Sequence, residues 1–340
     1  MNVINIILQY FLVALFVVGV IIVIRSHIIQ GVLKNGLQVT WKKKYLWFVA
    51  AFAGLATYGG EANFFANRLD AVSSFTSLIN AINDAVVKSE AQQVWTVVKR
   101  VFASAPGLMS MWILGALLII LAFAWIILMS QGALTRIAGR FMQDGSGSFF
   151  DGVAVSGKRF WDIVKVTIIF FLFGWGFWLL VTGLPTIIYF ATRNDAWKFV
   201  GQIGAYCSVV VSAMNLYLLQ FSFLEMLVWD EPAVLSIRKA WSIFREHTLL
   251  SIELALALFI VNLVVLVQVA AVLVVFVFPG SVPTLIFDIL ILFLELGLLT
   301  TFSYGATAAL YIQMRQGHPV GMLSTWTEKI VNMANKRTAV

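Results

Sequence analysis

Long apolar runs are the sequence feature that most constrains the fold of this chain. A helix needs about 20 mostly apolar residues to cross a bilayer. Hydrophobic residues make up 61% of the chain and charged residues only 11%, which are too few charges for a soluble protein of this length. The sequence predicts an all-α polytopic transmembrane bundle of about seven spans, at residues 4–24, 45–59, 107–130, 166–190, 202–229, 252–278 and 283–312.

The second run is the weakest of the seven, because its length of about 15 residues falls short of a full crossing. Two interpretations are open: it crosses a locally thinned bilayer with Lys44 snorkelling, or it lies in the interface. If all seven runs cross, 17 of the 23 Lys and Arg residues lie on one side of the membrane. Basic residues accumulate on the inner side, so we expect an outside N-terminus and an inside C-terminus.

Three further segments complete the expected topology. The first run lacks a basic start and a small-residue cleavage site, so we interpret it as a retained span within a transmembrane domain of residues 1–315. Apolar residues three or four apart in 60–106 predict an outer helical segment, which we interpret as a structural cap rather than a peptide-binding lid. Residues 316–340 are expected to form an inner amphipathic tail.

An internal repeat appears in three inner segments, at 39–45, 155–161 and 235–241. Each copy reads apolar, Ser or Thr, any residue, basic, basic, any residue, aromatic, and each leads into a span. Gly36 and Gly152 stand at the same offset before the first two copies. Chance under positive-inside pressure is the alternative, but three copies on one side of the membrane favour duplication.

The repeat predicts short helices that lie in the inner membrane interface. Their basic pairs would bind the phosphates of anionic lipids, while the aromatic ring sits at headgroup depth. In the third copy, Ile237, Trp241 and Phe244 are expected to form the apolar face. The candidate headgroup-binding residues are Lys42, Lys43, Lys158, Arg159, Arg238 and Lys239.

The three repeat segments resemble the bacterial membrane-domain family that is fused to some glycerophosphodiester phosphodiesterases. The resemblance rests on LVWDEPAVLSIRKAWSIFREHTLLSIELALALF, GSFFDGVAVSGKRFWDIVKVTIIFF and LKNGLQVTWKKKYLWFVAAFAGL. It implies a multi-pass domain of the bacterial cytoplasmic membrane. No soluble stretch is long enough to hold the phosphodiesterase half, so the resemblance carries over no catalytic residue.

Ionisable residues inside spans are costly and are functional candidates by default. Asp288 and Glu295 lie seven residues apart in the last run, and no Lys or Arg lies within a run to pair with them. We expect Glu295 to be protonated unless water or a cation enters. Two interpretations are open: a proton or cation site, or a neutral acid that is hydrogen-bonded between helices. The candidate donors are Asn215, Gln220, Asn262 and Gln268, of which Asn262 and Gln268 complete the predicted intramembrane site.

Other signals argue against several classes of function. The three histidines lack a second ligand at metal spacing, so we expect no metal or cofactor. The single cysteine, Cys207, lies in an apolar run, where a reactive thiol is not expected. No nucleophile and base form a recognised motif, so an enzyme is not expected. The net charge of +7 is spread over short loops, which does not fit a nucleic-acid-binding patch.

These observations leave two functional hypotheses from different classes. The leading one is a non-enzymatic organising, accessory or lipid-interacting membrane component with anionic lipids as partners. The alternative is a small-solute or ion transporter that uses Glu295 and Asp288. A transporter needs a polar path from Glu295 to both membrane faces, whereas a scaffold needs only a sealed bundle. A protein partner or a homo-oligomer is compatible with either hypothesis.

Overall fold

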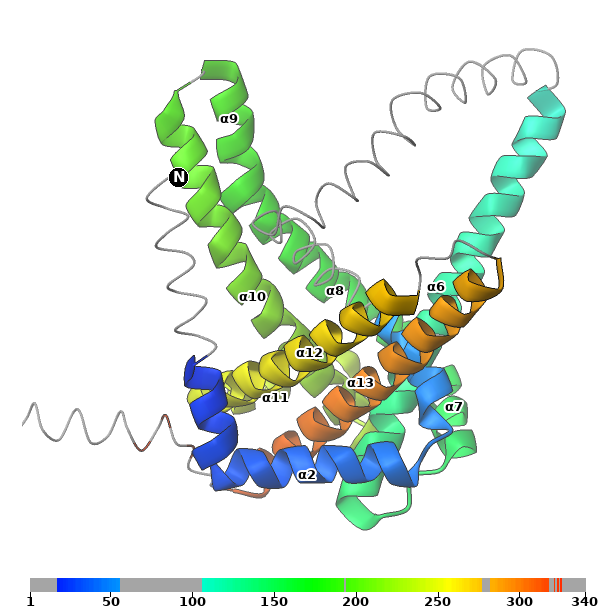
Figure 1. The fold of residues 1–340 in the computed structure, drawn as a ribbon, viewed down its shortest axis with the longest axis vertical. Coiled ribbons are helices and arrows are strands. Elements are labelled where there is room, and N and C mark those ends of the chain that lie inside the picture. Colours follow the sequence, from blue (N-terminus) through cyan, green and yellow to red (C-terminus); the bar gives the residue numbers. More distant parts are fainter. Residues whose placement is uncertain are drawn as a thin grey trace, which may run out of the picture. The chain divides into compact units, whose positions relative to one another are not determined.

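All regular structure in the described part of the chain is helical (Figure 1). The computed structural model describes residues 17–55, 106–192, 194–276 and 282–317, with positions 321, 323 and 325. The predicted all-α class is therefore confirmed for these residues. The first half of the first run, the expected outer segment and most of the tail lie outside them. The principal helices are α2 (His27–Lys42), α6 (Pro106–Asp144), α7 (Phe149–Lys158), α8 (Phe160–Trp178), η2 (Leu179–Gly183), α9 (Leu184–Thr192), α10 (Asp195–Val228), α11 (Ala233–Glu246), α12 (Thr248–Phe276) and α13 (Val282–Gln316).

Two of the described helices are long and apolar enough to cross a membrane: Ile113–Asp144 and Phe160–Tyr189. A third crossing is added if Val17–Arg25 and α2, which meet at 84°, count as one bent span. The helix in the doubtful second run, Leu46–Leu55, is among the shorter apolar helices. These helices are consistent with the predicted membrane localisation, while the number of seven spans stays a prediction.

The chain forms two compact units, residues 1–53 with 129–340 and residues 54–128. The core of the first unit joins α2, the helix Leu46–Leu55, the C-terminal half of α6 and α13. Its buried residues come from segments far apart in the sequence: Val39, Leu46, Ala50, Ala53, Leu134, Ile137 and Tyr304, with Phe141 and Met142 packed against them.

Glycine allows α2 to approach α13 closely. A Cβ atom at Gly36 would lie 2.9 Å from the Ala306 amide nitrogen and 3.0 Å from the Phe302 carbonyl oxygen. Gly305 faces the same contact, since its own Cβ would lie 3.1 Å from the Gly36 Cα. Small residues permit this backbone approach between membrane helices. The α2–α13 contact therefore depends on two glycines from opposite ends of the chain.

The second repeat copy packs in a similar way. A Cβ atom at Gly152 of α7 would lie 2.7 Å from a side-chain carbon of Ile137 and 3.0 Å from the Ala133 carbonyl oxygen, both on α6. Gly36 and Gly152, which align in the sequence repeat, thus occupy equivalent close contacts. The third copy has Pro232 at this offset, and Pro232 caps the start of α11.

A π-helical turn, η2, interrupts the fourth apolar run immediately before Pro185. Proline has no amide hydrogen, so the carbonyl oxygen of Val181 loses its helical donor. Gly204 of α10 lies against that oxygen, where a side chain would collide with it. Proline inside a helix disturbs the helical hydrogen bonds, and the π turn with its glycine contact is the form that this disturbance takes at Pro185.

Replacing Gly36 with Ala should lower the melting temperature of the purified protein. The added methyl group meets backbone atoms that cannot rotate away, and overpacking of this kind costs about 1–3 kcal/mol. Gly31→Ala is the matched control on the same helix, because no atom lies within 4 Å of a Cβ there. The control should keep or raise the melting temperature, since alanine favours helix over glycine by roughly 1 kcal/mol. Equal changes in melting temperature for the two variants would contradict the close contact between α2 and α13 at Gly36.

Candidate functional site: the repeat helices

The three repeat copies share one burial pattern. Their Ser or Thr residues, Thr40 of α2, Ser156 of α7 and Ser236 of α11, are all fully buried. Thr40 donates a hydrogen bond to the Gly36 carbonyl oxygen at 2.9 Å, and Ser236 donates one to the Ala233 carbonyl oxygen at 2.7 Å. The equivalence was read from the sequence alone, so the shared burial supports the alignment of the copies.

Helix geometry then fixes the direction of the two basic residues. Successive residues turn by about 100° in an α-helix, so the first basic residue lies about 200° from the buried Ser or Thr and the second about 300°. The first basic residue is accordingly exposed in every copy: Lys42, Lys158 and Arg238. The second is half-buried in every copy: Lys43, Arg159 and Lys239.

The second basic residue of the middle copy binds the turn between α10 and α11. The Arg159 guanidinium donates hydrogen bonds to the carbonyl oxygens of Asp230 at 2.9 Å and Glu231 at 3.0 Å. It also forms an ion pair of 3.3 Å with the Asp230 carboxylate. Asp230 has a φ of 58°, a conformation that non-glycine residues rarely adopt. Arg159 therefore holds an unusual turn in place.

The other half-buried cations also have contacts within the protein. The Lys239 ammonium pairs with the Glu231 carboxylate of the same turn. Lys43 lies over the Phe141 ring, with 5.7 Å between its Nζ and the ring centroid, and Lys42 approaches the same ring at 5.9 Å. Lipid contact was predicted for all six basic residues, and the exposed member of each pair is the one that its geometry leaves to the surroundings.

Large apolar side chains stand beside these exposed cations. The motif aromatics Tyr45, Trp161 and Trp241 are all exposed, Trp161 to 71%. In α11, the face buried in the protein consists of Ala233, Ser236, Ala240 and Phe244. The apolar face expected from the sequence is therefore split, because Phe244 packs inward and Trp241 points outward. Other exposed apolar residues on the repeat helices are Leu37, Trp41, Phe150, Val153, Val234 and Leu235.

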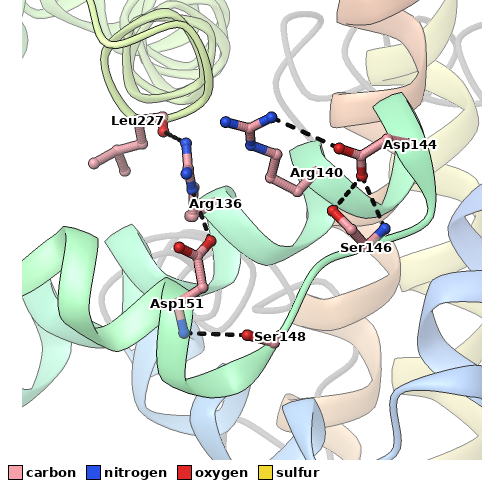
Figure 2. Close-up of polar contacts among 7 residues, drawn as sticks. All are labelled: Arg136, Arg140, Asp144, Ser146, Ser148, Asp151 and Leu227. Atoms are coloured by element: carbon pink, nitrogen blue, oxygen red, sulfur yellow. Dashed lines mark hydrogen bonds and ion pairs between the residues drawn. The ribbon is translucent and has the colours of Figure 1, made fainter.

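An ion pair and a hydrogen bond, both made by Arg136, join α6 to α7 and to α10 (Figure 2). The Arg136 guanidinium of α6 forms an ion pair of 3.1 Å with the Asp151 carboxylate of α7 and donates to the Leu227 carbonyl oxygen of α10. Ser148 caps the start of α7 by accepting a hydrogen bond from the Asp151 amide at 3.2 Å. One nearly buried arginine thus fixes α7 on α6 and α6 on the last turn of α10.

The end of α6 carries a second, more exposed cluster that Figure 2 also draws. Asp144 accepts hydrogen bonds from the Ser146 amide, at 2.8 Å, and from the Ser146 hydroxyl. Arg140 forms an ion pair of 3.6 Å with the other Asp144 oxygen. These contacts shape the short connection between α6 and α7.

Two fully buried acids, Glu225 and Glu253, were absent from the predicted site. Glu225 of α10 accepts a hydrogen bond from the Tyr311 hydroxyl and an ion pair from Arg315, both at 2.9 Å. The Arg315 guanidinium also stacks 3.9 Å from the centre of the Trp229 ring. Glu253 of α12 accepts from the Ser26 hydroxyl at 3.3 Å and from the Leu323 amide.

A sequence signal for these acids exists. Glu225 and Glu253 stand near the inner ends of their predicted runs, and Arg315 follows the last run directly. Acids at such depth need partners, and a cation at the same end of another run can supply one. Arg315 lies just outside the last run, so it was not among the partners expected within the runs.

Among the described side chains, the predicted intramembrane site is represented by Glu295 and Asn262. Glu295 is half-buried, and its Oε1 atom has no hydrogen-bond partner there. Asn262 is half-buried on α12, and Asn215 donates to the Phe170 carbonyl oxygen at 2.9 Å. The side chains of Asp288 and Gln268 lie outside the description, so their part in a site stays a prediction.

The comparisons with known proteins add no candidate function. Within the described residues, no three His, Cys, Asp or Glu side chains form a group that could hold a metal ion. No protein-family model matches the chain, and the comparisons with curated proteins and with solved structures found no match either. The resemblance to the membrane domain of certain phosphodiesterases therefore stays a prediction.

The adjacent residues Lys158 and Arg159 should respond differently to loss of charge. Arg159→Gln removes hydrogen bonds from a half-buried charged group, and bonds of this type contribute about 1.5–3 kcal/mol each at most. We expect a lower melting temperature for this variant and an unchanged one for Lys158→Gln, whose side chain is exposed. Differential scanning fluorimetry in detergent measures both. A stable Arg159→Gln protein would contradict the assigned role in the turn.

Proposed function

We propose that this chain is a non-enzymatic, multi-pass membrane component that binds anionic lipid through its three repeat helices. The proposal includes seven spans, an outside N-terminus and an inside C-terminus in the cytoplasmic membrane of a bacterium. In this arrangement α2, α7 and α11 lie in the inner leaflet interface, and one exposed cation of each meets lipid phosphate. The family resemblance is compatible with such a role and supplies no activity of its own.

One observation carries the proposal: each repeat helix leaves an exposed cation beside exposed large apolar side chains. On α2 these are Lys42 and Trp41, and on α11 they are Arg238 and Trp241. An apolar surface next to a cation suits the boundary between acyl chains and headgroups, where aromatic rings are enriched. Water alone would solvate such a surface poorly, because large exposed apolar patches are uncommon on soluble proteins.

The bend before α2 supports the same placement. Ser26 ends the helix Val17–Arg25 and caps α2 by accepting a hydrogen bond from the Ile29 amide. The two helices meet at 84°, so a first helix that crosses the bilayer would direct α2 nearly along the membrane plane. A serine cap at the corner satisfies an amide that would otherwise lack a partner.

Lipid binding is tested by neutralising the exposed cation of each copy. The triple variant Lys42→Gln, Lys158→Gln, Arg238→Gln should retain several-fold less anionic lipid through purification, since each basic residue near an anionic surface contributes roughly 1 kcal/mol. Quantitative mass spectrometry of co-purified phosphatidylglycerol and cardiolipin provides the measurement. Folding should be preserved, because these side chains are exposed.

A charge-preserving triple variant is the matched control. Lys42→Arg, Lys158→Arg and Arg238→Lys change the side-chain shape but keep the charge, so lipid retention should stay near that of the unmodified protein. If the Gln variant retains as much anionic lipid as this control, the cations do not bind lipid and only favour one membrane orientation. The proposed lipid-binding function would then be wrong.

The proposed topology is tested by reporter fusions in bacterial cells. Fusions after Gly60 and Asp195 should report the outer side, and a fusion after Val340 the inner side, because the basic segments accumulate inside. Paired alkaline phosphatase and fluorescent-protein reporters distinguish the two sides. An inner signal at Gly60 would show that residues 45–59 do not cross, and the proposed arrangement of the first repeat would fail.

A further inference from the structure

A stripe of polar residues runs along the C-terminal half of α13 and is separate from the repeat helices. Its members are three or four residues apart and so share one helix face. Glu295 lies about 140° around the helix from the nearest member, so it belongs to a different face. The stripe consists of Thr300, Tyr304, Thr307, Tyr311 and Arg315.

Helices α10 and α6 meet this stripe with polar residues of their own. Thr135, Gln220 and Leu224 line one narrow crevice together with Tyr304 and Thr307. About one helical turn further toward the C-terminus of α13, Tyr311 and Arg315 bind Glu225 of α10. We call the five residues of the stripe, together with Thr135, Gln220 and Glu225, the polar seam.

Four oxygen atoms of the polar seam have no hydrogen-bond partner within the described residues. They are Gln220 Oε1, Glu225 Oε2, Thr300 Oγ1 and Thr307 Oγ1. Each belongs to a residue that is at most 5% exposed. Buried polar groups in folded proteins are nearly always paired, and an unpaired one is strongly unfavourable. Four such atoms in one seam point to a missing ligand rather than to a tightly packed core.

The charges of the seam restrict what that ligand is. Glu225 is matched by Arg315, so the pair contributes no net charge to its surroundings. The unpaired atoms are all oxygens that accept hydrogen bonds, and the carboxylate and amide oxygens among them only accept. An anion is disfavoured, because Arg315 already pairs with Glu225 and the unpaired carboxylate and amide oxygens would repel it. A small hydrogen-bond donor or a monovalent cation fits.

We propose that the polar seam is the closed form of a crevice that takes up water or a monovalent cation from the Arg315 end. The space between Thr135, Gln220, Leu224, Tyr304 and Thr307 has no room for a water molecule in this conformation. Separation of α13 from α10 and α6 would admit a ligand and give the unpaired oxygens partners. Only the direction of entry, from the inner side, rests on the proposed topology.

Cysteine accessibility tests this proposal in membrane vesicles. Cys207, the single cysteine, is replaced by Ala, and Thr300→Cys or Thr307→Cys is introduced into that background. A small methanethiosulfonate reagent should modify both positions at least tenfold faster than Leu310→Cys, which is buried at similar depth on another face of α13. Reaction from the inner side only is expected. Reaction from the outer side only would leave the crevice intact and contradict the topology.

Added Na⁺ or K⁺ distinguishes the two ligands. Slower modification at Thr307→Cys in the presence of one ion identifies a cation, and an unchanged rate identifies water. Hydroxyl-radical footprinting of the unmodified protein gives a second readout that no variant affects. After correction for the intrinsic reactivity of each ring, Tyr304, in the seam, should be oxidised faster than Phe302, which lies on another face of α13. Thr307→Cys as unreactive as Leu310→Cys, with Tyr304 no faster than Phe302, would overturn the proposal.

Discussion

The close approach of α2 to α13 at Gly36 sets the orientation of the first repeat helix, and α7 meets α6 in a similar way at Gly152. Once the glycine and the Ser or Thr four residues later face the neighbouring helix, helical rotation directs the first basic residue away from it. The exposed cations are therefore a consequence of packing. A change at the glycines would alter which cations are exposed without replacing a charged residue.

Charged residues in this protein divide into two groups with different physical roles. One group, including Arg136, Arg159 and Arg315, binds carboxylates and carbonyl oxygens and joins helices that are distant in sequence. Arginine suits this role because its planar guanidinium donates several hydrogen bonds and remains charged when buried. The other group, including Lys158 and Arg238, is exposed and available to the surroundings. The repeat places one residue of each kind side by side in its middle copy.

Hydrophobic patterning predicted the helices well, and the repeat predicted where the short ones lie. Long apolar runs and basic interfacial segments are local features, which a sequence displays directly. The pairing of Glu225 with Arg315 was missed because the two residues are far apart in sequence and neither forms a motif. Likewise, the spacing in α11 marked Trp241 and Phe244 as one face, but the position of α10 decides that only Phe244 is buried.

Depth in the membrane is the property that links the packing of the repeat helices to their proposed function. Spin labels at positions 42, 158 and 238, in a protein without Cys207, report depth through their accessibility to oxygen and to a water-soluble nickel chelate. The account predicts that all three labels lie at headgroup depth on the inner side, and that their depths agree to within a few ångströms. Labels at different depths, or on opposite sides of the bilayer, would contradict it.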